Sequence, residues 1–201
     1  LVARMPLMPR LADPIARFQQ WFREARERGN ALPEIAVLAT ADRSARPSAR
    51  CVLLKRVDRR GFVFYTDATS RKGRELTANP LAALVSYWDE TRKQVRIEGR
   101  VERVSPAEAD ADWAARPRAN QLAILASAQS AELRRPRDLS DRVARAKRDL
   151  SGSEVRRPDR WTGYRLRPKR IEFWVHRADR LHRRELFTRA DAGWRRRLLQ
   201  P

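Results

Sequence analysis

The sequence predicts a mainly β protein, built as one antiparallel β-barrel with flanking helices. Short apolar segments follow one another at the spacing of hairpins, and few helical segments separate them. Residues 94–104 (QVRIEGRVERV) alternate apolar and charged side chains, a pattern typical of an antiparallel strand with one buried face. The early strands have no crossover helices between them, which disfavours a parallel α/β sheet.

The first half of the chain begins with a helix and continues with short strands. Apolar residues at helical spacing predict a helix from Asp13 to Arg28, with Pro14 at its first position. A second helix is expected from Arg71 to Asn79, capped by Ser70 and ended by Pro80. Gly61 closes a hairpin-like link because glycine adopts a positive φ at little cost. Strands are predicted at 34–41, 48–57, 61–66 and 81–88.

The second half follows the alternating strand 94–104 with two helices and further strands. The helices are expected at 106–115 and 138–150, with a polar, proline-containing connection at 134–137. Strands are predicted at 164–166 and 170–175, and a terminal pair around 185–188 and 194–198. We expect residues 1–12 to form a flexible N-terminal segment and residues 13–201 to form a single domain.

Composition excludes several classes of function. The formal net charge is +20, but the basic residues are spread over the whole chain rather than gathered in one tail, which disfavours nucleic-acid binding. No apolar run is long enough for a membrane span, and a cytoplasmic protein is expected. Cys51 is the only cysteine, so no internal disulfide forms, and together with two histidines it predicts no metal site.

Three cations stand where a helix already supplies positive charge. Arg71, Lys72 and Arg74 fall in the first turn after Ser70, where the helix dipole disfavours cations. An anion bound at this helix N-terminus would explain them, because free N–H groups and the dipole favour a phosphate. Arg71 would add a planar fork and Lys72 a point charge. A solvated, arginine-rich helix start explains the same residues equally well.

An ordered set of short motifs extends this reading. They are RCVLLK (50–55), FYT (64–66), SRKGREL (70–76), KQVRIEG (93–99), RP (116–117), SAQS (127–130), IEFW (171–174) and RLHRR (180–184). Together they resemble the pyridoxamine 5′-phosphate oxidase family of FMN enzymes, from about Asp13 to Pro201. The resemblance implies a split β-barrel of the FMN-binding type. It also implies a homodimer with FMN bound across the subunit interface.

The resemblance assigns residues to the flavin. Arg71 and Lys72 would hold the FMN phosphate, and Gln94 would reach the isoalloxazine ring. The other implied flavin residues, some of them from the second subunit, are Arg50, Val52, Leu53, Tyr65, Thr66, Gln129, Ser130, Trp174 and Arg184.

The implied substrate site departs from the family pattern. Lys55 and Arg116 stand where the family grips a substrate phosphate, and Arg180 and His182, the implied catalytic residues, would lie over the substrate ring. Asp112 replaces the usual tyrosine and Asn120 the usual serine among these substrate-binding positions. A carboxylate beside a phosphate dianion repels it, whereas an asparagine still donates a hydrogen bond.

Two enzyme activities therefore remain open. The first is oxidation of pyridoxine or pyridoxamine 5′-phosphate to pyridoxal 5′-phosphate, with O2 as the acceptor. The second is the same flavin chemistry on another substrate, such as a dihydrophenazine carboxylic acid. The phenazine-biosynthesis oxidases also have a tryptophan before the Arg-Pro pair, and Trp113 stands at that position in this sequence. A non-catalytic flavin-binding or nucleic-acid-binding module is the third possibility. Retention of Arg180 and His182 disfavours it.

Overall fold

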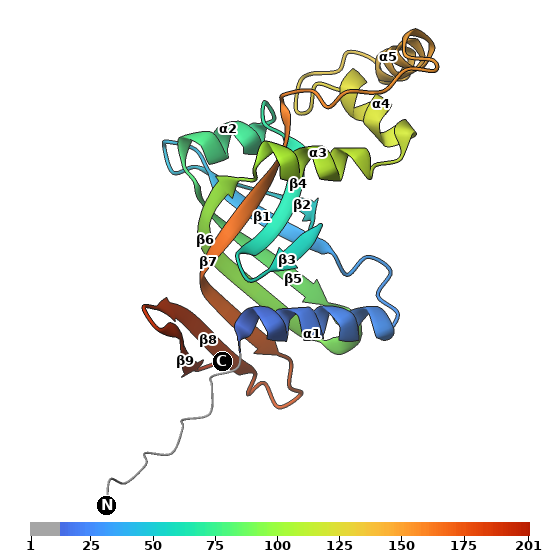
Figure 1. The fold of residues 1–201 in the computed structure, drawn as a ribbon. Helices are drawn as coiled ribbons and strands as arrows, with labels where there is room; N and C mark the ends of the chain where they lie inside the picture. The colour runs from blue at the N-terminus through green and yellow to red at the C-terminus, as the bar shows by residue number, and fades with distance from the viewer. Residues whose placement is uncertain (1–12) are drawn as a thin grey trace, which may run out of the picture.

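The computed structural model describes residues 13–201 as helices packed around one antiparallel sheet (Figure 1). The predicted flexible segment 1–12 lies outside the described residues. The helices are α1 (Pro14–Glu27), α2 (Arg71–Ala78), η1 (Asp89–Thr91), α3 (Pro106–Ala114), α4 (Arg118–Ala126) and α5 (Pro136–Asp149). The strands are β1 (Ile35–Ala41), β2 (Pro47–Leu53), β3 (Arg56–Asp58), β4 (Gly61–Asp67), β5 (Leu81–Trp88), β6 (Lys93–Arg103), β7 (Trp161–Val175), β8 (Arg183–Ala190) and β9 (Gly193–Leu199).

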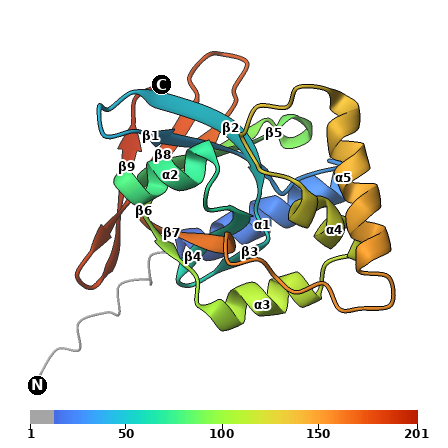
Figure 2. The ribbon, with the colours of Figure 1, turned by 90° about the horizontal axis from the view of Figure 1, so that it is seen from above.

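The strands curl into a barrel in the order β2-β1-β5-β6-β7-β4-β3, and β8 and β9 extend it from β7. All the described strand pairs are antiparallel, as the sequence predicts. Helices α2 to α5 gather around one end of the barrel, whereas β8 and β9 lie at the other end (Figures 1 and 2). Helix α1 lies across the barrel, and its Phe18 packs against Phe62 of β4 and Trp88 of β5, with ring centroids 4.9 and 5.6 Å away.

The predicted strand 48–57 is wrong, because the chain changes partner in its middle. Strand β2 pairs with β1, and Leu54 N still donates to Glu34 O at 2.9 Å. The next residue, Lys55, donates its N–H to Val63 O of β4 at 2.8 Å, and β3 then pairs with β4. A uniform apolar run gives no signal for such a change of partner.

The predicted strands 164–166 and 170–175 are one strand, β7, of 15 residues. Pro168, which donates no N–H, falls where the register between β6 and β7 shifts at Glu98/Gly99. Gly99 permits the close approach, since a Cβ there would lie 2.0 Å from Arg167 O. One half of β7 pairs with β4 and the other half with β8, so this strand joins the two ends of the barrel. Helix α4, which the sequence analysis did not predict, follows α3 at the helical end.

Candidate functional site

The turn before α2 fixes the start of that helix. Ser70 is fully buried, and its Oγ accepts a hydrogen bond from Gly73 N at 3.3 Å and donates one to Asp67 O at 2.6 Å. A Cβ on Gly73 would lie 2.2 Å from Ala68 O, so only glycine lets the helix start this close to the turn. Ser70 is therefore the N-cap that the sequence predicts, and it anchors the cationic first turn.

Lys72 points inward from this turn and is 9% exposed. Its Nζ donates to Gln129 Oε1 at 2.9 Å and to Thr66 Oγ1 at 3.1 Å, and it lies 3.4 Å from Ser70 Oγ. Within the described part of the chain, no carboxylate lies within ion-pair distance of this ammonium. Burial, together with the nearby Arg50 guanidinium, lowers the pKa of Lys72. A buried cation held by neutral oxygens is a candidate binding element for an anion.

The loop after α4 supplies the partners of this turn. Gln129 Oε1 also accepts from Thr66 Oγ1 at 2.7 Å, and Ser130 Oγ accepts from the backbone N of Arg71 at 3.2 Å. Ser130 has a φ of 71°, which turns the loop toward α2. The predicted flavin residues Thr66, Arg71, Lys72, Gln129 and Ser130 are thus brought together. With Arg50 they are called the α2 site below.

Arg160 holds that loop in place, a role that the sequence analysis missed. Its Nε donates to Asp67 Oδ2 at 2.9 Å, and its Nη2 donates to three backbone carbonyls, those of Ile124, Leu125 and Ser127, at 2.9–3.1 Å. It thereby ties the end of α4 to β4. No local pattern around Arg160 indicates this contact, because its partners are distant in the sequence.

Glu75 is the second residue that the sequence analysis missed. It is buried, and its carboxylate accepts hydrogen bonds from the side chains of Thr40, Ser48, Arg50 and Arg71. Although burial acts in the opposite direction, these hydrogen bonds lower the pKa of Glu75 to about 2. The spacing of Arg71 and Glu75 at i and i+4 was the available sequence signal.

Arg50, Val52 and Leu53 do not all face the same way. Arg50 donates to Thr40 Oγ1 and Ser48 Oγ, both at 2.5 Å, inside the α2 site. Val52 packs against the main core, and Leu53 is 42% exposed on the other face of β2. The side chain of Leu53 therefore points away from Arg50, since successive residues of a strand alternate.

The predicted substrate residues are divided between two places. Arg116 binds Asp112 through both its Nε and its Nη2, at 2.8 and 2.7 Å, and its guanidinium lies 4.8 Å from the Trp161 ring centroid. The predicted flavin residue Tyr65 lies beside it, 5.8 Å from the same guanidinium, and burial followed by the Asp112 charge raises the pKa of the Tyr65 phenol. Asn120 is exposed on α4. Lys55 is also exposed and lines a pocket together with residues of α1.

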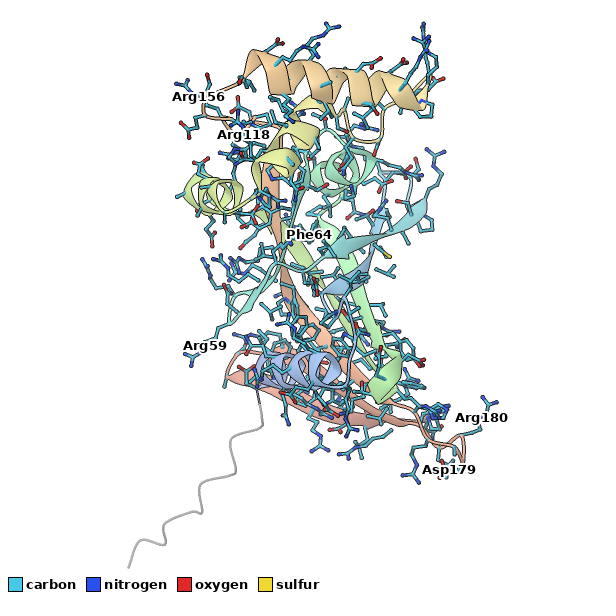
Figure 3. The ribbon with its side chains drawn as sticks, turned by 90° about the vertical axis from the view of Figure 1, so that its right-hand side faces the viewer. Arg59, Phe64, Arg118, Arg156, Asp179 and Arg180 are labelled. Atoms are coloured by element: carbon cyan, nitrogen blue, oxygen red, sulfur yellow. The ribbon has the colours of Figure 1, made fainter. Side chains whose placement is uncertain are left out.

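The remaining predicted residues lie at the other end of β7. Gln94 of β6 and Arg184 of β8 both pair with Trp174, and the His182 ring lies 4.8 Å from the Trp174 ring. Arg180 has a φ of 65° and is exposed at the tip of the loop between β7 and β8 (Figure 3). We call these five residues the β7–β8 site.

The two sites are far apart within one chain. Thr66 pairs with Thr162 at the start of β7, whereas Gln94 pairs with Trp174 near its end. At about 3.3 Å per residue, the segment from Thr162 to Trp174 has an extended length of at most roughly 40 Å. Figure 3 shows Arg180 at the end of the molecule opposite Arg118 of α4. The α2 site and the β7–β8 site therefore cannot enclose one ligand within a single chain.

The residues described by the structure contain no cluster of His, Cys, Asp and Glu that could hold a metal ion. Among them there is also no helix that combines the length and the apolar character required to cross a membrane.

The fold defines a split β-barrel protein, and its α2 site holds a buried lysine that has no carboxylate partner among the described residues. Residues 22–149 match the family model described as pyridoxamine 5′-phosphate oxidase, and residues 161–201 match the C-terminal dimerisation region of pyridoxine 5′-phosphate oxidase. The chain belongs to the pyridoxamine 5′-phosphate oxidase family, as the ordered motifs indicate. It is an oxidoreductase of that type.

Individual relatives agree with this assignment. The chain is 51% identical to a pyridoxine/pyridoxamine 5′-phosphate oxidase of Rubrobacter xylanophilus over 94% of this chain and 87% of that protein. It is 49% identical to the enzyme of that name from Myxococcus xanthus, over 94% and 92% of the two chains. Among solved structures, PhzG from Burkholderia lata in complex with tetrahydrophenazine-1-carboxylic acid has a TM-score of 0.90 and 36% identity, over 98% of both chains. This similarity confirms the predicted split barrel.

The loss of stability on removal of the Glu75 charge should depend on pH. The folded protein lowers the pKa of this carboxyl from 4.5 to about 2, so its stabilising effect is complete above pH 4.5 and is lost as the pH falls toward 2. We expect Glu75→Gln to lower the free energy of unfolding by on the order of 2–3 kcal/mol at pH 7 and by less than half as much at pH 3. Urea unfolding at both pH values measures this. An equal loss at the two pH values would contradict it.

Proposed function

We propose that this chain is an FMN-dependent oxidase that converts pyridoxine or pyridoxamine 5′-phosphate to pyridoxal 5′-phosphate with O2 as the acceptor. The observation that carries the proposal is the buried Lys72 ammonium, which donates to the neutral oxygens of Thr66 and Gln129 and has no carboxylate partner within residues 13–201. The names of the relatives at about 50% identity support the choice of substrate.

The α2 site suits a terminal phosphate, as FMN carries. Lys72 would supply a charge-assisted hydrogen bond, and the first turn of α2 would supply N–H groups and the positive end of the helix dipole. Arg71, whose side chain is 60% exposed, stands at the outer edge of the same turn. When bound, the flavin supplies the redox chemistry by accepting a hydride from the substrate and passing the electrons to O2.

A second copy of the chain would bring the β7–β8 site to the α2 site. Four of the five residues of the β7–β8 site lie within residues 161–201, which match a dimerisation region, and the fifth, Gln94, pairs with Trp174 of that region. The sheet also offers an apolar outer face for a partner. Its members, all with side chains at least 37% exposed, are Ile35, Val37, Leu53, Leu81 and Tyr87. A patch of exposed hydrophobic side chains, such as this one on β1, β2 and β5, is typical of a homodimer interface.

The side chains around the substrate would bind its phosphate and orient and polarise its ring. Arg116 and Lys55 would hold the phosphate, and Arg180 and His182 of the second copy would lie over the pyridine ring. The reaction of pyridoxine 5′-phosphate with O2 yields pyridoxal 5′-phosphate and hydrogen peroxide. Pyridoxamine 5′-phosphate in addition takes up one water and releases ammonia.

A second candidate substrate is a reduced tricyclic carboxylic acid. PhzG, which matches this chain over nearly its full length, is described with tetrahydrophenazine-1-carboxylic acid. Oδ2 of Asp112 accepts from Nε and Nη2 of Arg116, and this negative charge would oppose the binding of a phosphate dianion beside it. A substrate without a phosphate would leave that ion pair intact.

Lys72→Ala should weaken FMN binding without unfolding the protein. A charge-assisted hydrogen bond contributes about 1.5–3 kcal/mol, which corresponds to roughly 10- to 100-fold in Kd. Because the ammonium is buried without a counter-charge, apoprotein stability should be unchanged or raised. Flavin fluorescence titration and thermal unfolding measure the two effects. Lys147→Ala, an exposed lysine on α5, is the control. Wild-type FMN affinity in Lys72→Ala would remove Lys72 from the site.

Subunit complementation tests whether the site is shared between two copies. Lys72→Ala and His182→Ala homodimers should each be nearly inactive. After they are mixed, unfolded and refolded together, half of the dimers should be hybrids, and each hybrid has one intact site. We therefore expect the mixture to show about a quarter of wild-type peroxide release from hybrids present in random proportions, when it and both parents are assayed at an FMN concentration that fills the wild-type site but lies well below the Kd of Lys72→Ala. If the mixture stays as inactive as its parents, the site is not shared in this way.

Asp112→Asn should lower the KM for pyridoxine 5′-phosphate. The variant keeps the side-chain size but frees Arg116 of its counter-charge, and at an effective dielectric of about 20 one charge pair at about 4 Å is worth on the order of 4 kcal/mol before solvent screening reduces it. We expect a drop of about tenfold or less in KM, with kcat little changed, whereas Lys55→Ala should raise KM. Peroxide release measures both.

Flavin-loaded wild type that oxidises neither pyridoxine nor pyridoxamine 5′-phosphate would overturn the proposed activity. Peroxide release with a dihydrophenazine carboxylic acid in the same assay would then favour the second candidate.

A further inference from the structure

Glu75 joins the two arginines of the α2 site through one carboxylate. Its Oε1 accepts from Arg71 Nε at 2.8 Å, and its Oε2 accepts from Arg50 Nη2 at 3.1 Å. The same Oε2 accepts from Thr40 Oγ1 at 2.5 Å and from Ser48 Oγ at 2.7 Å. One side chain of α2 is thereby fixed to both β1 and β2.

The hydrogen bonds leave particular donors of Arg71 free. Glu75 takes only its Nε, and neither Nη makes a hydrogen bond to another described residue. The backbone N of Arg71 is held separately by Ser130 Oγ. Arg71 is thus anchored at two points, while the two ends of its guanidinium remain available on the outer side of the turn.

Arg50 is held more completely. Its Nη1 donates to Leu38 O and Thr40 Oγ1, and its Nη2 donates to Ser48 Oγ and Glu75. The guanidinium cannot turn without breaking several of these hydrogen bonds. It therefore supplies a fixed positive charge beside Lys72, which is consistent with the lowered pKa of Lys72.

We propose that Glu75 is a positioning residue for the phosphate of the bound flavin, acting through Arg50 and Arg71. This inference rests on the proposed function and adds to it a residue that would not touch the ligand. The three cations of the α2 site repel one another, and a buried carboxylate between Arg50 and Arg71 keeps both in place without occupying Lys72. The site would keep a net charge of +2, from Arg50, Arg71 and Lys72 against Glu75.

Two other roles predict different behaviour. If Glu75 only competed with the phosphate for the arginines, removal of its charge would tighten FMN binding. If it only stabilised the packing of α2 on β1 and β2, its removal would weaken all flavins equally. A positioning role weakens the binding of flavins that carry the phosphate and spares those that lack it.

The experiment compares FMN with riboflavin, which has the same ring and ribityl chain but no phosphate. Dissociation constants are measured by flavin fluorescence with apoprotein of the full chain, at a temperature where thermal unfolding shows each variant folded. We expect Glu75→Gln to raise the Kd of FMN by about tenfold and that of riboflavin by less than about threefold. Glu102→Gln removes the same charge from an exposed pair with Arg167 and should change neither.

A double-mutant cycle with Arg71→Ala keeps the inference falsifiable if Glu75→Gln proves unstable at higher temperatures. In the Arg71→Ala background, the effect of Glu75→Gln on the Kd of FMN should fall to at most half of its value, in logarithmic terms, in the wild-type background. Equal losses for FMN and riboflavin, tighter FMN binding, or full additivity with Arg71→Ala would each overturn the positioning role. If wild type itself binds FMN no better than riboflavin, the proposed function fails instead.

Discussion

Strand β7 is the constraint on which the arrangement of this protein depends. It pairs with β6 along its length, with β4 through its first half and with β8 through its second. Continuous pairing past Pro168 requires the irregular register opposite Gly99, where a larger residue would collide with Arg167 O. Because the strand is 15 residues long, it holds the α2 site and the β7–β8 site at opposite ends of the barrel. A site made from both needs two chains.

The α2 site is governed by desolvation. Lys72 is buried among hydroxyl and amide oxygens, which satisfy its hydrogen bonds but not its charge. Glu75, one helical turn away, is also buried, but its charge is compensated, since two guanidinium groups and two hydroxyls surround its carboxylate. Glu75 thus neutralises part of the charge of Arg50 and Arg71, whereas Lys72 has no counter-charge among the described residues. A bound phosphate would complete that balance.

The charge of Arg116, unlike that of Lys72, is already compensated within the described part of the chain. Here Oδ2 of Asp112 already accepts from both Nε and Nη2 of Arg116, and the guanidinium lies 4.8 Å from the ring centroid of Trp161 and 5.8 Å from that of Tyr65. Family membership and the α2 site are therefore both consistent with a flavin oxidase. At α3, however, a substrate phosphate would have to compete with Asp112 for Arg116, and this competition would set the affinity for a phosphorylated substrate. That competition is the feature that separates this chain from the pattern its motifs otherwise follow.

The sequence by itself determined the class of fold, the cap at Ser70, the cationic first turn and the family, because alternation, capping and motif order are local patterns. Only the tertiary structure decided that Lys72 has no carboxylate partner within residues 13–201 while Arg71 has one, since both outcomes depend on which elements pack against α2. It also decided that Glu75 contacts Thr40 and Ser48, and that Arg180 and His182 lie far from Lys72. Burial and the length of a paired strand arise from contacts between distant segments, and no local pattern encodes them.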